Sequence, residues 1–226
     1  MKKAVHLVKK NLIPTFSPSM RRAFFIAGIL LFVLFVLYTL AVRHDLLRSW
    51  DFNMTVKLQD RIPLRFDSFF SFLSVFGRFE TSLIILSIIL AIRRKILGFF
   101  IIGLFGFGHV IEIIGKSLLE QPGPPHMFLR TTEMASEFPG LYIHTGASYP
   151  SGHSMRAIYL CIIIILILYN SKKLSAYVKF PIIGLVVLYA FLMLLSRVSL
   201  GEHWTTDIIG GGLLGASFAF FALLFL

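Results

Sequence analysis

The sequence predicts an all-α integral membrane protein, a bundle of six transmembrane helices with an active site on its outer face. Of the 226 residues, 57% are hydrophobic, whereas soluble domains average roughly 45–50%. The mean hydropathy is +0.82, and the apolar residues gather in runs long enough to cross a bilayer. Polar residues stand at the ends of several runs, where they converge on one side of the membrane and indicate a site.

The chain is expected to form a single domain over residues 1–226, because the apolar runs follow one another with short breaks and no linker. Its net charge is +11. The basic residues flank apolar runs, so the charge reflects membrane topology and not nucleic-acid binding. The single cysteine, Cys161, lies inside an apolar run. An internal disulfide and a multi-cysteine metal site are therefore excluded.

The chain begins with a basic segment, residues 1–22, which is expected to stay in the cytoplasm. The first span, 23–42, is too long for a signal-peptide core and is read as a retained helix. Residues 43–66 are charged and mixed, and 67–77 are expected to lie along the membrane interface. A second span follows and ends at residue 92. Its first residue is not defined by the sequence, because Arg78 and Glu80 interrupt the apolar run. Four further spans are expected at 96–119, 152–170, 177–195 and 204–226.

The distribution of basic residues predicts that both termini lie inside. With the N-terminus in the cytoplasm, the inner segments carry 12 basic residues and the outer segments 7, as the positive-inside rule prefers. The polar run ends then face outward. This predicts a multi-pass protein of the bacterial inner membrane with an extracytoplasmic site.

Glycines recur in the spans, and Gly211 and Gly215 have the small-x-x-x-small spacing that lets helices approach closely. Packing within the bundle and dimerisation both fit this spacing, so the oligomeric state stays open.

His203 and Asp207 are four residues apart at the start of the last span, so they share a helix face. A carboxylate there accepts a hydrogen bond from one imidazole nitrogen and leaves the other free to attack. The alternative is a polar pair that only holds helices together.

Ser151, Gly152 and His153 open the fourth span. The serine is suited to capping the helix, and the glycine lets backbone approach an anion bound at the helix N-terminus. His153 then projects from the first turn, where an imidazole can protonate a leaving oxygen. The alternative is an ordinary cap with a surface histidine.

Two cations flank these residues. Arg197 presents a planar fork suited to phosphate, or else it is an interfacial arginine that snorkels. Lys116 shares a helical stripe with His109 and Glu112. It is either a phosphate ligand or the neutralising partner of Glu112.

Two stretches resemble signature motifs of the type 2 phosphatidic acid phosphatase family. Pro150-Ser151-Gly152-His153 matches PSGH, and Ser196-Arg197 with His203 and Asp207 matches SR-x5-H-x3-D. The resemblance covers about residues 70–220, with motifs between 116 and 207. The first motif, K-x6-RP, diverges: Lys116 is in place, but Gly123 stands where the arginine belongs. Arg130 is the favoured substitute for that cation, and Arg156 is the alternative.

The resemblance implies a lipid phosphate or diphosphate phosphatase that forms a phosphohistidine on His203. Asp207 would orient the nucleophile, and His153 would be the general acid. Lys116, Arg130, Arg197 and the backbone at Ser151 and Gly152 would bind the phosphoryl oxygens. No metal or other cofactor is implied.

The expected partners are the membrane and a phospholipid or polyprenyl phosphate substrate. Phosphatidate, phosphatidylglycerol phosphate and undecaprenyl diphosphate all remain open. Two other readings stay open as well: a lipid phosphotransferase with the same site, and a non-catalytic lipid-binding or transport protein.

Overall fold

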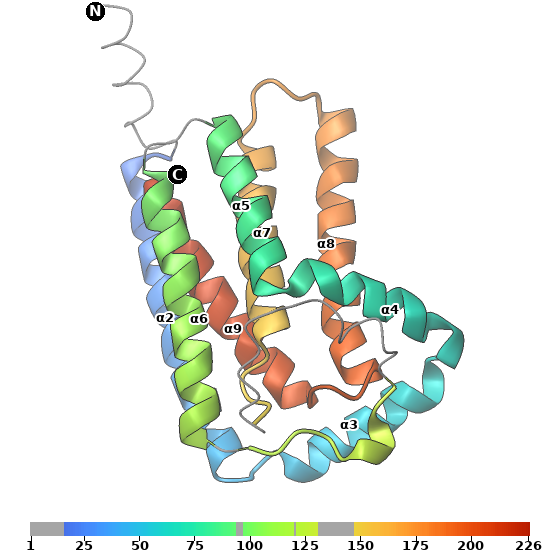
Figure 1. Ribbon diagram of the computed structural model, residues 1–226. Coiled ribbons are helices and arrows are strands. Elements are labelled where there is room, and N and C mark those ends of the chain that lie inside the picture. The colour runs from blue at the N-terminus through green and yellow to red at the C-terminus, as the bar shows by residue number, and fades with distance from the viewer. Residues whose placement is uncertain (1–15, 94–96, 120, 131–146) are drawn as a thin grey trace, which may run out of the picture.

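The computed structural model describes residues 16–93, 97–119, 121–130 and 147–226. In these residues the regular secondary structure is helical (Figure 1). One isolated antiparallel bridge joins Pro122 to Ala147 and so brings together the two ends of the connection between α6 and α7.

Five of the described helices are long and apolar enough to cross a membrane. A sixth crossing results if the bent pair formed by residues 64–77 and α5 counts as one span. These helices confirm the predicted apolar runs. The five are α2 (Pro18–Arg43), α6 (Gly98–Leu119), α7 (Gly152–Tyr169), α8 (Ala176–Ser199) and α9 (Thr205–Ala222), the last of which runs on into η5 (Leu223–Phe225).

The second predicted span corresponds to α5 (Phe79–Arg93). The segment before it, in which 67–77 was expected to lie along the membrane interface, forms η1 (Leu64–Phe66), α4 (Asp67–Ser74) and η2 (Val75–Gly77). The chain bends by 58° between this segment and α5, near Arg78. The apolar pattern therefore continues through residues 67–77 as a helix that turns away from α5 (Figure 1).

Helices α7 and α9 form the centre of the bundle. About 56% of the most apolar window of each is buried, against 17% for α2 and 11% for α8. A Cβ atom at Gly211 would collide with the Ser151 carbonyl, and one at Gly215 with the Met155 carbonyl. The two glycines therefore let α9 lie directly against α7, which is packing within the bundle.

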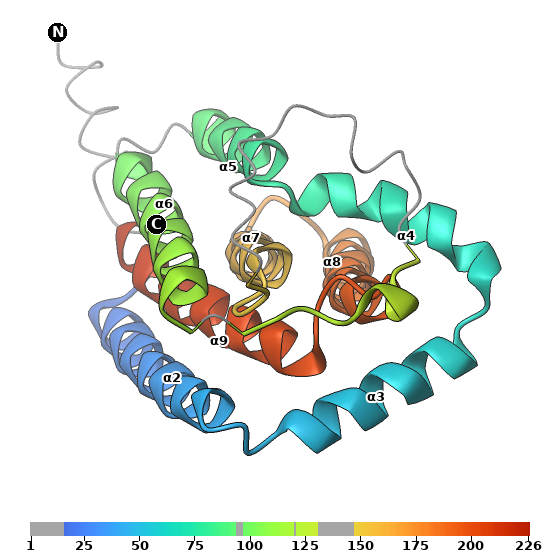
Figure 2. The same ribbon diagram turned by 60° about the horizontal axis from the view of Figure 1, so that its bottom comes forward.

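Helix α3 (Arg48–Arg61) crosses one end of the bundle, below α8 and α9 (Figures 1 and 2). This helix was not predicted from the sequence, because residues 43–66 are charged and mixed. Its buried side chains are polar and recur every fourth residue: Asp51, Thr55 and Gln59. We call this end of the bundle the α3 end. The start of α2 and the end of η5 lie together at the opposite end (Figure 1).

Candidate active site

His203 and Asp207 meet at the α3 end, where the loop after α8 enters α9. The Nδ1 atom of His203 lies 3.3 Å from Oδ2 of Asp207. The same oxygen accepts a hydrogen bond from the Trp204 N–H at 2.9 Å, so Asp207 also caps its own helix. Both residues are buried. With Nδ1 facing the carboxylate, Nε2 is the nitrogen of His203 that is available for attack.

Ser151 links the two motifs. Its side chain caps α7 by accepting from the Ser154 N–H, as predicted. Its own N–H donates to the Asp207 carbonyl at 2.9 Å. Just before it, the Tyr149 hydroxyl lies 2.8 Å from Thr39 Oγ1 on α2. The first turn of α7 is therefore fixed to the start of α9 and to α2.

His153 lies in the first turn of α7 with 8% of its surface exposed. The space around its ring depends on Gly77, because a Cβ there would come within 2.6 Å of the imidazole. The ionisable side chains around His153 are those of Arg197, Arg156, His203 and Lys116. The structure therefore brings both predicted catalytic histidines and two of the predicted cations into one region.

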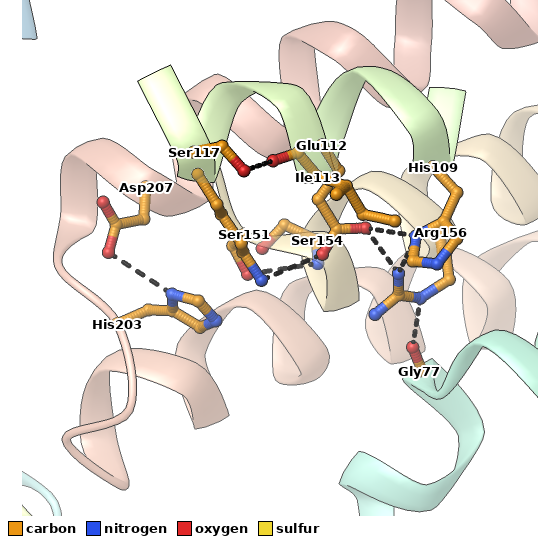
Figure 3. Close-up of polar contacts among 11 residues, drawn as sticks. Gly77, His109, Glu112, Ile113, Ser117, Ser151, Ser154, Arg156, His203 and Asp207 are labelled. Carbon is orange, nitrogen blue, oxygen red and sulfur yellow. Dashed lines mark hydrogen bonds and ion pairs between the residues drawn. The ribbon is translucent and has the colours of Figure 1, made fainter. Parts of the chain in front are cut away.

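Glu112 is the centre of an ion-pair group beside this region, and Figure 3 shows Ser151 between that group and the His203–Asp207 pair. Its carboxylate accepts from Lys116 Nζ at 3.0 Å and from Arg156 Nη1 at 2.7 Å. His109 Nδ1 lies 2.8 Å away. A Cβ atom at Gly152 would overlap this carboxylate, so the glycine of the second motif makes room for Glu112.

We expect Glu112→Gln to destabilise the protein by about 3 kcal/mol, because removing one partner of a buried ion pair leaves charges unpaired. The amide would also point a donor at the cationic groups. Thermal unfolding in detergent measures the change. Glu80→Gln is the control, because Glu80 is an exposed carboxylate in the first turn of α5. Equal Tm values for the two variants would contradict a structural role for the Glu112 group.

Arg197 is fully buried at the end of α8. Its guanidinium donates to Glu202 Oε2 at 2.5 Å, to Ser196 Oγ at 3.1 Å and to Ser74 Oγ. These bonds use three of its five N–H groups, which leaves donors for a further oxygen. The snorkelling alternative is wrong, since 1% of the side chain is exposed.

Arg130, the favoured substitute for the missing cation, lies against the end of α3. Its guanidinium donates to the backbone carbonyls of Gln59 at 2.9 Å and Ile62 at 3.1 Å. These carbonyls lie at the C-terminal end of α3, where the last carbonyls of a helix lack partners and attract a cation. These bonds use two of the five N–H groups of its guanidinium, and the role of Arg130 as the substitute cation stays a prediction. Arg156, the alternative, is engaged by Glu112 and by the Gly77 carbonyl at 2.8 Å.

Gly123, at the divergent position, lines a cavity of about 480 Å³ between the end of α2, α3 and the segment that follows α6. Trp204 and Thr206 line the same cavity, and Trp204 Nε1 donates to the Pro122 carbonyl at 2.9 Å. The segment of the first motif is thus attached to the residue that follows His203.

Three residues that contact the site were not predicted from the sequence: Ser74, Asp51 and Gln59. Ser74 bonds to Arg197. Asp51 and Gln59 belong to a segment without apolar periodicity, and only the fold brings them to the two ends of the loop that carries His203. In the described part of the chain, no three His, Cys, Asp or Glu side chains gather closely enough to hold a metal ion.

Comparison with known proteins identifies the family and a similar fold. The model of the PAP2 superfamily matches residues 95–226, and no curated protein sequence matches the chain. Among solved structures, the first transmembrane PAP2-type phosphatidylglycerolphosphate phosphatase from Bacillus subtilis is similar, with a TM-score of 0.68 and 23% sequence identity. That alignment covers 86% of this chain and 93% of the other. With more than half of its length matched, including His203 and Asp207, the chain belongs to the PAP2 superfamily.

Proposed function

We propose that the chain is a membrane lipid phosphatase that hydrolyses a lipid phosphate or diphosphate through a phosphohistidine on His203. The observation that carries this proposal is the His203–Asp207 pair, which the Ser151 N–H bonds directly to the first turn of α7. Nucleophile, orienting carboxylate and helix N-terminus are thereby held as one unit.

In the first step, His203 Nε2 attacks the phosphorus, and the bond between phosphorus and the leaving oxygen breaks. Asp207 accepts the Nδ1 proton in a hydrogen bond and stabilises the charge that develops on the ring. His153 donates its proton to the leaving oxygen as general acid. The products are the lipid alcohol, or the lipid monophosphate from a diphosphate, and phosphohistidine.

In the second step, His153 takes a proton from water, and the water oxygen attacks the phosphorus. The phosphorus–nitrogen bond breaks, which frees His203 and inorganic phosphate. The same imidazole thus acts first as an acid and then as a base, and it is ready for the next cycle.

The phosphoryl oxygens are bound by Lys116, Arg197 and the first N–H groups of α7. Lys116 gives one hydrogen bond to Glu112 and has two further donors. The helix N-terminus adds partial positive charge. Positioned cations and dipoles of this kind stabilise the transition state of phosphoryl transfer.

The substrate class is supported by the helical surface, since the exposed faces of α2 and α8 are apolar and the site lies at the end of these spans. The solved relative is named as a phosphatidylglycerolphosphate phosphatase. We therefore place phosphatidylglycerol phosphate, phosphatidate and undecaprenyl diphosphate in the substrate panel.

Phosphate release by the purified protein from these three lipids, with and without EDTA, tests the proposal. We expect release from at least one lipid, unchanged by the chelator. Transfer of phosphate to an added lipid or sugar alcohol in preference to water would identify a phosphotransferase. No release and no transfer with any lipid would leave a non-catalytic lipid-binding protein.

We expect the α3 end to face the outside of the cell. Met127→Cys is the probe there, because Met127 is 81% exposed. Lys172→Cys, in the exposed turn between α7 and α8, probes the other end. A membrane-impermeant maleimide should label position 127 on intact cells and position 172 only after lysis. The native Cys161 is buried and should stay unlabelled. The reverse labelling pattern would show that the α3 end faces the cytoplasm.

A further inference from the structure

Helix α3 contacts both ends of the loop that carries His203. We define this loop as residues 199–206, from the last residue of α8 to the second residue of α9. The helix lies outside the region matched by the family model, residues 95–226. Its contacts come from a buried stripe of polar side chains on one helix face.

Asp51 holds the C-terminal end of loop 199–206. Its Oδ1 accepts from the Thr206 N–H at 2.8 Å, and its Oδ2 accepts from the Thr206 hydroxyl at 2.5 Å. Thr206 is fully buried and immediately precedes Asp207. The second N–H of a helix lacks an intrahelical partner, so α3 supplies an acceptor from a different helix. A carboxylate there also faces the positive end of the α9 dipole.

Gln59 holds the N-terminal end of the same loop, two turns further along α3. Its Nε2 donates to the Ser199 carbonyl at 3.0 Å and to the Phe128 carbonyl at 2.6 Å. Arg130 strengthens this end: its guanidinium binds the end of α3, and its backbone N–H donates to the Leu200 carbonyl at 2.8 Å.

We propose that α3 is a positioning element for catalysis, in which Asp51 and Gln59 hold loop 199–206 at its two ends and thereby place the His203 imidazole. The inference rests on the proposed role of His203 as nucleophile. Neither residue touches the substrate. Their effect is on the approach of Nε2 to phosphorus, where a shift of about 1 Å costs on the order of 10²-fold in rate.

Thr55 provides a matched control on the same face. It lies between Asp51 and Gln59 in the stripe and is fully buried, but among the described residues its hydroxyl has no hydrogen-bond partner. Thr55→Val keeps the shape and removes only that hydroxyl. Asp60→Ala is a second control, which removes an exposed carboxylate from the same helix.

The test compares kcat, KM and Tm for these variants on whichever lipid the parent protein hydrolyses. Asp51→Ala and Gln59→Ala should each lower kcat by about 10-fold or more and leave KM within about 2-fold. Thr55→Val and Asp60→Ala should match the parent. Asp51→Asn should recover most of the loss, because an amide can still bond to both Thr206 groups.

Stability separates positioning from simple support of the fold. Burial raises the pKa of Asp51, and the hydrogen bonds from Thr206 offset this only in part. Since the folded-state pKa exceeds the unfolded value, stability falls as pH rises between the two, and the carboxylate is a net cost at neutral pH. Asp51→Asn should therefore have a Tm no lower than the parent.

A second readout does not need turnover. Diethyl pyrocarbonate reacts with a free imidazole nitrogen, and mass spectrometry gives its rate at His203. Asp51→Ala should change this rate, because displacement of loop 199–206 alters both the exposure of the His203 ring and the contact of its Nδ1 with Asp207. The controls should react like the parent. If the parent hydrolyses no lipid but this difference appears, the proposed function fails and the positioning of His203 by α3 stands. Lower Tm values with parental kcat and parental carbethoxylation in Asp51→Ala and Gln59→Ala would overturn the inference.

Discussion

Replacing His203 by alanine should abolish phosphate release while leaving the protein folded. The imidazole is the proposed nucleophile, and within the described chain no other histidine contacts a carboxylate four residues further along the sequence. The Asp207 side chain would still accept from the Trp204 N–H in the variant, so the start of α9 keeps its cap. Turnover on the lipid panel and thermal unfolding measure the two effects.

The matched control is His126→Ala. His126 is an exposed histidine in η3 (His126–Phe128), in the connection between α6 and α7. It should keep parental turnover. Turnover near the parental rate in His203→Ala would remove this residue from the mechanism.

Asp207→Asn should lower kcat by about 10⁴-fold, the loss seen in catalytic triads when the orienting aspartate becomes an amide. The Trp204 N–H and Nδ1 of His203 both lie against Oδ2 of Asp207. An amide oxygen at that position can still accept from the Trp204 N–H, so the helix cap survives. It carries no negative charge, so it cannot stabilise the positive charge that develops on the His203 ring during attack.

The measurement is single-turnover phosphate release together with Tm. We expect a large kinetic loss with a Tm close to the parent, because the substitution keeps volume and capping. A kcat within 10-fold of the parent would show that Asp207 caps α9 but does not orient His203 for attack.

The sequence predicted the apolar architecture and the core of the site for clear physical reasons. Length and hydropathy identify spans such as α7 and α8 without any tertiary information. The close spacing of His203 and Asp207 predicted their contact, although His203 lies in the loop just before α9 and not on a shared helix face. The capping preference of Ser151 marks the start of α7. Each of these inferences depends on neighbours within a few residues.

The remaining features depend on contacts between distant segments. Helix α3 was missed because its buried face is polar, with Asp51 and Gln59 bonded to groups more than 60 residues away. The bonds of Arg130 to the end of α3 could not be predicted, because its proximity to Gly123 in sequence says nothing about the unpaired carbonyls of that helix. Glu112 was recognised as a partner of Lys116, but its bond to Arg156 joins α6 to α7 and requires the fold.

The most direct test of the central claim is to trap the covalent intermediate in His153→Ala. With a labelled lipid phosphate whose leaving group needs no protonation, the first step can proceed, but the base that activates water is missing. We predict an acid-labile, base-stable phosphoprotein whose label maps to the peptide containing His203, and which is absent from the double variant with His203→Ala. Label on any other residue, or steady phosphate release in the double variant, would contradict the account.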